Sequence, residues 1–409
     1  MDKREKKKIL FIINTMGRAG AETALIELLK KLDTMGIYEL YLYVIIPCGE
    51  LFEGLPDNVH ILNKRILTTS LLSYQGRVSI ALSVVYSFFY KLTGFRLLRY
   101  MVKIIKEQKK SGGKLQYDKL LWRLLATGRP DMLGDYDLAV AYIEGAATYF
   151  LADKVKASRK AAFVHIDYQR AGYTRHLDKD CYKFMDKIFV VSQEVGEKFC
   201  WVYPQYRDKV RLFRNLLNRE EIIRKAKSGL GFTDAYTGIR LVTVGRLHYQ
   251  KGYDIAIKAL AKLKEEGYDL RWYVIGEGME RKNLQILIKK YGLEEDFILM
   301  GAKDNPYPYI RQADIYVQAT RFEGKSIAIE EAQILGKVIL ASDCTGNREQ
   351  IKDGYDGVLF TLTVENLVRE LKNVISKPEL QEKYAEHVLE KKINFPEDIQ
   401  ALLGLLSGN

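Results

Sequence analysis

The sequence has few cysteines and no long hydrophobic run. Its 409 residues include four cysteines without CxxC spacing, at positions 48, 181, 200 and 344. This pattern indicates neither a disulfide framework nor a zinc site, and it is typical of a reducing cytosol. The apolar run of residues 9–13 is too short for a secretory signal, and the uncharged run of residues 78–90 is shorter than the about 20 residues that span a bilayer. We therefore expect no transmembrane helix.

Familiar phosphate and metal motifs are also missing. The glycines of the first loop do not follow GxGxxG spacing and no Walker lysine follows them, which excludes a dinucleotide fingerprint and a P-loop. No DxD motif lies in a loop after a predicted strand, and histidines and cysteines do not cluster, so we expect no metal site. The composition, 47% hydrophobic and 28% charged, is that of a globular protein, and the length suggests two or three domains.

Acidic residues are scarce in one segment only. Residues 64–129 contain fourteen Lys and Arg but only two acids, Glu107 and Asp118, so this segment carries the whole net charge of +12. Its basic residues are interleaved with leucine and aromatic residues. Nucleic acid is the weaker partner for it, because no nucleic-acid-binding fold is recognisable. Basic amphipathic helices favour an anionic membrane surface and docking of a lipid-linked acceptor, and a solvated helical insertion is the alternative.

Outside that segment, apolar strands alternate with amphipathic helices. Buried strands are predicted in the first half at residues 8–14, 41–47, 137–143, 161–166, 187–192 and 209–215, and in the second half at 239–245, 270–276, 297–301, 315–319 and 338–342. Such alternation is typical of parallel sheets covered by helices. We expect an α/β protein with one doubly wound domain at 1–217, which contains a basic helical insertion at about 64–130. A second domain is expected at 218–388, and a C-terminal helix at 389–409 is expected to pack back on the first domain.

The loops that follow the strands hold the candidate ligand-binding residues, because open parallel sheets bind ligands at the carboxyl ends of their strands. The first loop has Gly17 and Gly20 ahead of a helix whose N-terminal amides suit phosphate, and a tight turn is the alternative. A later loop has Arg246 and Lys251, which together can neutralise a diphosphate, and a solvated pair of charges is the alternative. The turn of residues 276–278 is a third close-approach loop.

A fourth loop, residues 321–332, places two carboxylates around the start of a helix. Glu323 lies ahead of the helix, where a carboxylate can accept hydrogen bonds from sugar hydroxyls. The amides of Ser326 and Ile327 are candidates for holding phosphate. Glu331 lies inside the helix and suits a ribose diol, whereas the neighbouring Glu330 is expected to be a surface charge.

The segments VGRLHYQKG, VIGEGME and FEGKSIAIEEA, in this order and spacing, resemble the retaining glycosyltransferases of family 4. The similarity is strong over residues 241–360, the first loop is similar to the GGAE loop of that family, and the similarity weakens in residues 64–129. The resemblance implies the GT-B fold, two Rossmann-like domains facing a cleft. It also implies a nucleotide-sugar donor, expected to be a UDP sugar, with no cofactor and no metal.

Roles follow from the same resemblance. Arg246 and Lys251 match the pair that binds the donor diphosphate and stabilises the leaving group. Glu323 matches the glutamate that contacts the donor sugar, and Glu331 matches the one that binds the ribose. The resemblance further implies donor contacts at Gly17, Gly20, Gly276, Gly278, Gly324, Ser326 and Ile327.

On the first domain, His165 is similar to the family histidine that lies near the reacting sugar, and a structural histidine is the alternative. The expected catalytic set is therefore His165, Arg246, Lys251 and Glu323. Asp167 is a plausible acceptor-binding carboxylate.

The sequence also departs from the family pattern. Ala19 and Thr23 stand where the family often has Gly and Arg, and Lys325 and Ser326 replace a frequent aromatic residue and proline. These departures leave the donor sugar open.

The expected activity is metal-independent, retaining transfer of a hexose-type sugar to a lipid-linked saccharide in surface-polysaccharide synthesis. The enzyme is expected in the cytoplasm, peripheral on the inner face of the membrane. A transferase with a soluble acceptor and a catalytically silent sugar-nucleotide-binding subunit are the alternatives.

Overall fold

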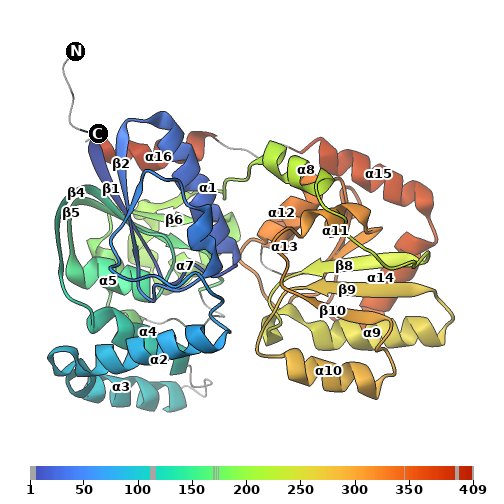
Figure 1. Cartoon of the computed structure of the whole chain (residues 1–409), viewed down its shortest axis with the longest axis horizontal. Coiled ribbons are helices and arrows are strands. Elements are labelled where there is room, and N and C mark those ends of the chain that lie inside the picture. The colour runs from blue at the N-terminus through green and yellow to red at the C-terminus, as the bar shows by residue number, and fades with distance from the viewer. Residues whose placement is uncertain are drawn as a thin grey trace. The chain divides into compact units, whose positions relative to one another are not determined.

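The computed structural model describes residues 6–110, 117–168, 171, 173, 175–344, 346–391 and 396–407. The chain divides into two compact units, which are described separately (Figure 1). Unit 1 contains residues 1–216 and 395–409, and unit 2 contains residues 217–394. The second boundary differs from the predicted one by six residues, since 389–394 belong to unit 2.

Unit 1 is built on a seven-stranded parallel sheet. In sheet order its strands are β3 (Val59–Ile61), β2 (Tyr38–Val44), β1 (Lys7–Ile13), β4 (Met132–Ala141), β5 (Val155–Val164), β6 (Lys187–Val190) and β7 (Val210–Leu212). The central strand β1 is covered on both faces, because residues 9–13 are all inaccessible to solvent. Its helices outside the insertion are α1 (Gly20–Met35), α5 (Ala146–Lys154), α6 (Arg175–Asp178), α7 (Gln193–Val202) and α16 (Pro396–Leu403).

The basic insertion is helical, as predicted, and forms a layer outside α5. It comprises α2 (Tyr74–Phe89), α3 (Thr93–Lys110) and α4 (Tyr117–Thr127). In unit 1, α4 packs on α5, while α2 and α3 pack on α4 and on each other (Figure 1). One stretch, Tyr74–Lys106, is long and apolar enough to span a membrane by length and composition, but the chain reverses within it, at Lys91 and Leu92. Each helix alone, at 1.5 Å per residue, is shorter than the about 30 Å hydrocarbon core.

The C-terminal segment belongs to unit 1 through a buried ionic contact. The carboxylate of Asp398 in α16 accepts hydrogen bonds from the backbone N–H of Arg214 at 2.8 Å and from its guanidinium at 3.1 and 3.2 Å. Asp398 is buried and Arg214 is half-buried, so this contact is partly shielded from water. It anchors α16 to the segment that follows β7.

Unit 2 is a six-stranded parallel sheet. In sheet order its strands are β10 (Phe297–Gly301), β9 (Leu270–Ile275), β8 (Ile239–Val244), β11 (Ile315–Gln318), β12 (Val338–Ser342) and β13 (Val358–Phe360). Strands β9 and β10 lie on one side of β8, and β11 to β13 lie on the other. Because β8 and β11 are paired neighbours, the loops that follow these two strands lie side by side. The helices are α8 (Arg219–Lys227), α9 (Tyr253–Glu265), α10 (Arg281–Lys290), α11 (Tyr307–Gln312), α12 (Ile327–Ile334), α13 (Asn347–Gln350), α14 (Val364–Ile375) and α15 (Pro378–Leu389).

The strand predictions miss two short outer strands and the first residues of some longer ones. The short outer strands β3 and β13 were not predicted, because three residues are too few for a periodic signal. Strand β2 begins at Tyr38, three residues before its predicted start, and β5 begins at Val155, six residues early. Most of the residues that extend them, such as Glu39 in β2 and residues 156–160 in β5, are exposed or half-buried and mostly polar, so they lack the continuous apolar run of the central strands.

Candidate functional site

The loops after β8 and β11 bring Lys251 and Glu323 together. Lys251 Nζ forms an ion pair with Glu323 Oε2, and only 13% and 15% of the two side chains are exposed. Both residues were predicted site residues, and they lie 72 positions apart in the sequence. A partly desolvated pair of this kind holds a cation and a carboxylate in fixed positions beside the sheet end.

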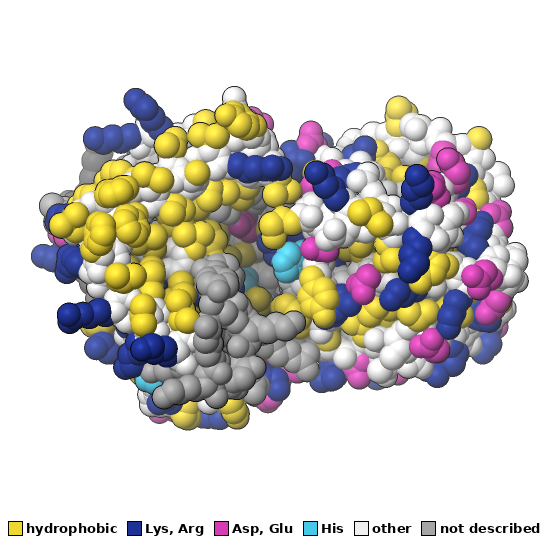
Figure 2. All heavy atoms as spheres, turned by 90° about the horizontal axis from the view of Figure 1, so that it is seen from below, with side chains coloured by type: hydrophobic (Ala, Val, Ile, Leu, Met, Phe, Trp, Pro, Cys, Tyr) yellow, Lys and Arg dark blue, Asp and Glu magenta, His cyan; other side chains and the backbone are white. Residues whose placement is uncertain are grey.

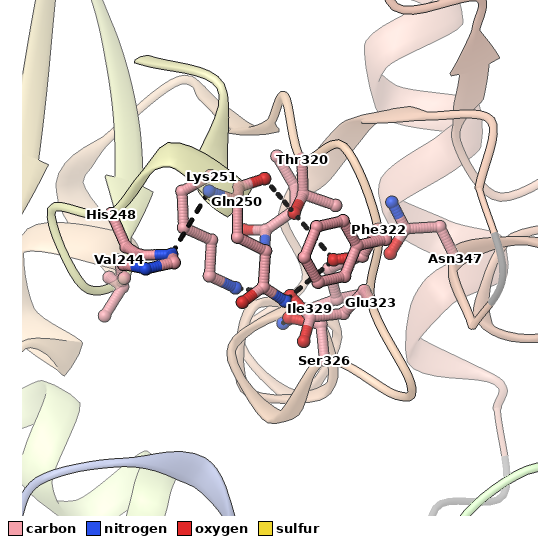
Figure 3. A network of polar contacts seen from close by, with 12 residues as sticks. Val244, His248, Gln250, Lys251, Thr320, Phe322, Glu323, Ser326, Ile329 and Asn347 are labelled. Atoms are coloured by element: carbon pink, nitrogen blue, oxygen red, sulfur yellow. Dashed lines mark hydrogen bonds and ion pairs between the residues drawn. The ribbon is translucent and has the colours of Figure 1, made fainter. Parts of the chain in front are cut away.

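A network around Gln250 fixes the two loops to each other (Figure 3). The Gln250 side chain donates to the Phe322 carbonyl at 2.8 Å. The backbone carbonyl of Gln250 accepts from Thr320 Oγ1 at 2.9 Å and from the Arg321 N–H at 2.7 Å. His248 Nδ1 accepts the Gln250 N–H at 3.3 Å. The position of Lys251 opposite Glu323 is therefore set by backbone contacts on both sides.

Arg321 adds a second connection between the same loops. Its guanidinium makes two hydrogen bonds to the Asp254 carboxylate, at 2.8 and 2.9 Å, and one to the Tyr249 carbonyl at 2.7 Å. The guanidinium holds the pKa of Asp254 below its ordinary value, although burial acts in the opposite direction. The Arg321 guanidinium thus has a structural role within the protein and is not a free cation for a ligand.

Two glycines allow the loops to approach this closely. Gly252 has φ +62°, and a Cβ there would lie 2.0 Å from the Ala319 carbonyl oxygen. Gly276 has φ +152°, and a Cβ there would lie 2.0 Å from the Gly245 carbonyl oxygen. The turn of Gly276 and Gly278 therefore packs against the backbone of the Arg246 loop, so these two predicted donor residues have a structural reason to be glycine.

Arg246, the second predicted cation, is exposed beside this network. Among the residues that the structure describes, it makes no ion pair, whereas Lys251 is already paired. The aliphatic part of the Lys251 side chain packs against the start of its own loop. A Cβ added at Gly245 would lie 3.3 Å from Lys251 Cε. The structure thus places one predicted cation in a fixed contact and leaves the other at the surface.

Glu331 is a buried carboxylate on α12. Its Oε1 accepts a hydrogen bond from Tyr307 Oη at 2.8 Å, a partner that the sequence did not reveal. Burial, helped by the neighbouring Glu330 carboxylate, raises the pKa of Glu331 to about 7 against the opposing hydrogen bond from Tyr307. At neutral pH this carboxylate can therefore exchange a proton.

Glu330 was expected to be a surface charge, and this was wrong. It is buried and pairs with Lys325 Nζ at 2.5 Å, and burial raises its pKa. The α12 helix is enclosed along most of its surface, so both of its adjacent glutamates turn inward. Lys325, which departs from the family pattern, is the counter-charge.

The start of α12 differs from the expected phosphate cradle at one residue. The Ser326 N–H donates to Gln350 Oε1 at 2.8 Å, and Gln350 Nε2 donates back to the Ser326 carbonyl at 2.8 Å. The Ser326 amide is thus engaged within the protein and does not offer a phosphate donor. The Ser326 hydroxyl caps α12 by accepting the Ile329 N–H, which leaves the Ile327 amide as the remaining predicted donor.

In unit 1, the predicted first loop follows β1 and leads into α1. Gly20 is the first residue of α1 and is exposed, whereas Gly17 is buried against Leu71. Behind them, Thr15 Oγ1 donates to the buried Glu22 carboxylate at 3.1 Å. Only Gly20 of the two predicted glycines therefore presents its backbone to solvent.

His165 lies at the carboxyl end of β5, where the sequence placed it. Its backbone N–H donates to Glu144 Oε2 at 2.9 Å, and its Nε2 is buried without a hydrogen-bond partner among the described residues. Burial lowers the pKa of His165 to about 4, against a hydrogen bond with the Tyr142 backbone. The imidazole is neutral at pH 7, and its Nε2 is enclosed by the protein in this conformation.

Glu144 is a site residue that the sequence analysis missed. It follows β4 by three residues, is buried, and has a pKa raised by burial. Its carbonyl accepts from Asn14 Nδ2 at 3.2 Å, so the ends of β1, β4 and β5 meet here. A carboxylate beside a glycine just after a central strand was the available signal.

Asp167 does not fit the predicted acceptor contact. Its side chain is completely buried, so its carboxylate cannot touch an acceptor in this conformation. Farther along, Asp178 also faces inward: it accepts hydrogen bonds from the hydroxyls of Tyr149, Tyr168 and Tyr203 at 2.6, 2.6 and 2.8 Å. Burial raises the pKa of Asp178 to about 6.

Residues 235–390 match the family model described as "Glycosyl transferases group 1". A Campylobacter jejuni protein, N-acetylgalactosamine-N,N'-diacetylbacillosaminyl-diphospho-undecaprenol 4-alpha-N-acetylgalactosaminyltransferase, is 31% identical over 43% of this chain and 47% of its own length. The Erwinia amylovora amylovoran biosynthesis glycosyltransferase AmsD is 28% identical over 52% of this chain and 59% of its own. The chain thus spans about half the length of the curated relatives that it matches.

The solved structures extend the similarity to the whole chain. Anabaena Alr3699/HepE in complex with UDP and glucose has a TM-score of 0.69 at 17% identity, covering 98% of this chain and all of that one. WaaG, a glycosyltransferase involved in lipopolysaccharide biosynthesis, has a TM-score of 0.60 at 16% identity, covering 97% and 99%. The predicted fold class is therefore confirmed: this chain has the GT-B fold.

Proposed function

We propose that this chain is a glycosyltransferase that moves a hexose-type sugar from a nucleotide donor to a lipid-linked saccharide in surface-polysaccharide synthesis. The observation that carries the proposal is the Lys251–Glu323 pair, fixed at the sheet end of the region that matches group 1 glycosyl transferases. The names of relatives support it, since one acts on a diphospho-undecaprenol saccharide and another belongs to amylovoran biosynthesis. A solved neighbour with UDP and glucose makes a UDP sugar the first donor to test.

In this proposal the two cations of the β8 loop act on the leaving group. Departure of a nucleotide diphosphate builds negative charge on its oxygens, and fixed cations lower that barrier. Lys251 is held in place by Glu323, so an arriving diphosphate meets an ammonium that is already positioned. Arg246 is exposed and can fold over the same diphosphate with a planar donor fork.

The two carboxylates take different parts of the donor. Glu323 has one oxygen on Lys251 and retains lone pairs for hydroxyls of the donor sugar. Glu331, on the next helix, would accept hydrogen bonds from the ribose diol in its ionised form. We assign the transfer a retaining course by front-face attack, with neutral His165 near the reacting sugar, and no metal.

We further propose that the enzyme works in the cytoplasm, peripheral on the inner face of an anionic membrane. A lipid-linked acceptor resides there, and the basic insertion of unit 1 supplies a surface of opposite charge. A transferase with a soluble acceptor would not need this surface. A catalytically silent subunit would not need the Lys251–Glu323 ion pair.

The test is turnover with Lys251→Ala, after a thermal-shift panel of nucleotide sugars has identified the donor. Loss of a charge-assisted contact costs about 1.5–3 kcal/mol, and more in the transition state, so kcat should fall at least about tenfold. Lys258→Ala, an exposed lysine on α9, is the matched control and should keep full activity. Undiminished turnover of Lys251→Ala would refute the role, and wild-type protein without transfer or nucleotide-sugar hydrolysis would be a silent subunit.

A further inference from the structure

Helix α2 is apolar on its outer face as well as its inner one, where Ile80 and Val84 pack against the core of unit 1. Its fully buried positions are small or polar: Gly76, Ser83 and Ser87. A second row of large apolar side chains lies outside, at i, i+4, i+7 and i+11, with Leu82 64% and Phe89 61% exposed; the row comprises Val78, Leu82, Val85 and Phe89. A helix in water normally turns this face toward the core.

Helix α3 continues the apolar surface and borders it with positive charge. Phe95, Leu98 and Val102 are exposed at i, i+3 and i+7. The basic residues stand one position later, so they form a neighbouring stripe: Arg96, Arg99, Lys103 and Lys106. We call the exposed apolar residues of α2 and α3 the ridge and these four basic residues the flank. Figure 2 views the side on which α2 and α3 lie and shows hydrophobic side chains gathered over unit 1, with Lys and Arg at the margins.

The flank leads into a pocket of about 450 Å³ between α3 and the segment around α6. Its cationic lining is Lys103, Arg175 and Lys179, and His176 lies beside them. Lys179 Nζ lies 4.4 Å from the centre of the Tyr100 ring, and Arg175 is oriented by the Val202 carbonyl and Gln205. Asp180 is the acid at this pocket, and one of its oxygens accepts the Tyr206 hydroxyl at 2.7 Å.

The backbone at the pocket is held in an unusual conformation. Lys179 and Asp180 both have positive φ, 49° and 53°, although neither is glycine. Such residues cost free energy and are concentrated at functional positions. Burial and the nearby Arg123 guanidinium lower the pKa of Lys179. A bound anion would raise this pKa again by stabilising the charged ammonium.

We infer that the α2–α3 hairpin docks this chain on an anionic bilayer, with the ridge among the acyl chains, the flank on lipid phosphates and one phospholipid headgroup in the pocket. Large exposed apolar patches mark interaction sites, and the basic flank selects a negative partner. A second copy of the chain is a poorer occupant, because it would bring an equally basic flank against this one. The inference is independent of the donor site.

The experiment measures co-sedimentation of the full chain with phosphatidylcholine vesicles, with and without phosphatidylglycerol, at low and high salt. Wild-type protein should bind the phosphatidylglycerol vesicles and be partly released by salt. Leu82→Ser with Leu98→Ser should weaken binding more than tenfold. Arg96→Gln with Arg99→Gln should weaken it about fivefold for each charge lost. Since these side chains are exposed, folding should be unaffected, which the unfolding midpoint checks.

Matched changes on α10 of unit 2 are the controls. Ile286→Ser removes an apolar side chain that is 70% exposed, and Lys282→Gln with Lys289→Gln removes two exposed charges; neither should alter binding. Lys179→Gln should lower the preference for phosphatidylglycerol while retaining binding through the ridge. An unchanged preference would refute the pocket as a headgroup site. Docking would be overturned if wild-type protein did not bind at low salt or if the controls lost binding equally. It would also be overturned if the chain formed dimers through this face without vesicles. None of these measurements requires a sugar donor.

Discussion

At the scale of single residues, Glu331 couples the candidate site to pH. Burial raises its pKa from an ordinary value near 4.5 to about 7. The folded chain therefore keeps this proton at pH values where the unfolded chain has lost it, so this residue's contribution to stability falls as the pH rises from about 4.5 to about 7. Above that range the buried negative charge costs up to about 3 kcal/mol.

We therefore predict that Glu331→Gln, which keeps the Tyr307 contact without the charge, stabilises the protein at pH 8 but little at pH 5. Thermal unfolding at the two pH values measures this, as the difference between variant and wild type. The exposed Glu294→Gln is the control for removing one carboxylate. If Glu331→Gln and wild type change in parallel between pH 5 and pH 8, Glu331 does not have the raised pKa.

At the scale of elements, the loop between β8 and α9 depends on one glycine. Gly252 combines a positive φ with a carbonyl oxygen where its Cβ would be, whereas Gly292 has nearly the same φ, +65°, and open space around it. Backbone strain alone costs an alanine about 1 kcal/mol at either position. The contact with Ala319 must in addition push apart the loops that carry Lys251 and Glu323.

We predict that Gly252→Ala loses stability and weakens nucleotide binding. Gly292→Ala should lose only the stability that backbone strain costs, and it should bind the nucleotide normally. Urea unfolding and calorimetry with UDP measure the two effects. Equal behaviour of the two variants would mean that the close approach of the loops does not position the site.

Elements with a long apolar signal were predictable, and contacts across the fold were not. The central strands β1, β8 and β9 and the loops that follow them lie where the sequence placed them, because continuous apolar runs have few alternatives to a buried strand. The pairing of Glu330 with Lys325 and the burial of Asp167 depend on packing from distant segments. The same holds for α2, whose composition predicted a basic insertion but not that small residues would face inward.

At the scale of the whole molecule, the proposed function requires side chains to balance the charge of a diphosphate. Among the described residues there is no grouping of three or more His, Cys, Asp or Glu that could hold a metal ion, while Lys251 is fixed at the site. We predict that transfer activity survives saturating EDTA. Loss of activity that Mn²⁺ or Mg²⁺ restores would contradict this.

The last prediction concerns the division of work between the two units. The nucleotide contacts are assigned to unit 2, through Lys251 and Glu331, while His165 belongs to unit 1. Binding of the free nucleotide should therefore depend mainly on unit 2, whereas turnover should depend on both. Glu323, which is assigned to the sugar, should behave like His165 although it lies in unit 2.

Calorimetry with UDP and GDP and steady-state turnover separate these roles. Glu331→Ala should weaken nucleotide binding, by about tenfold if one charged hydrogen bond is lost. Glu323→Ala and His165→Ala should bind it nearly as wild type and turn over more slowly, because free UDP lacks the sugar that they are assigned to contact and Lys251 keeps its charge without Glu323. His60→Ala, an exposed histidine on β3, should change neither quantity. Nucleotide binding weakened by His165→Ala but not by Glu331→Ala would reverse the assignment of the two units.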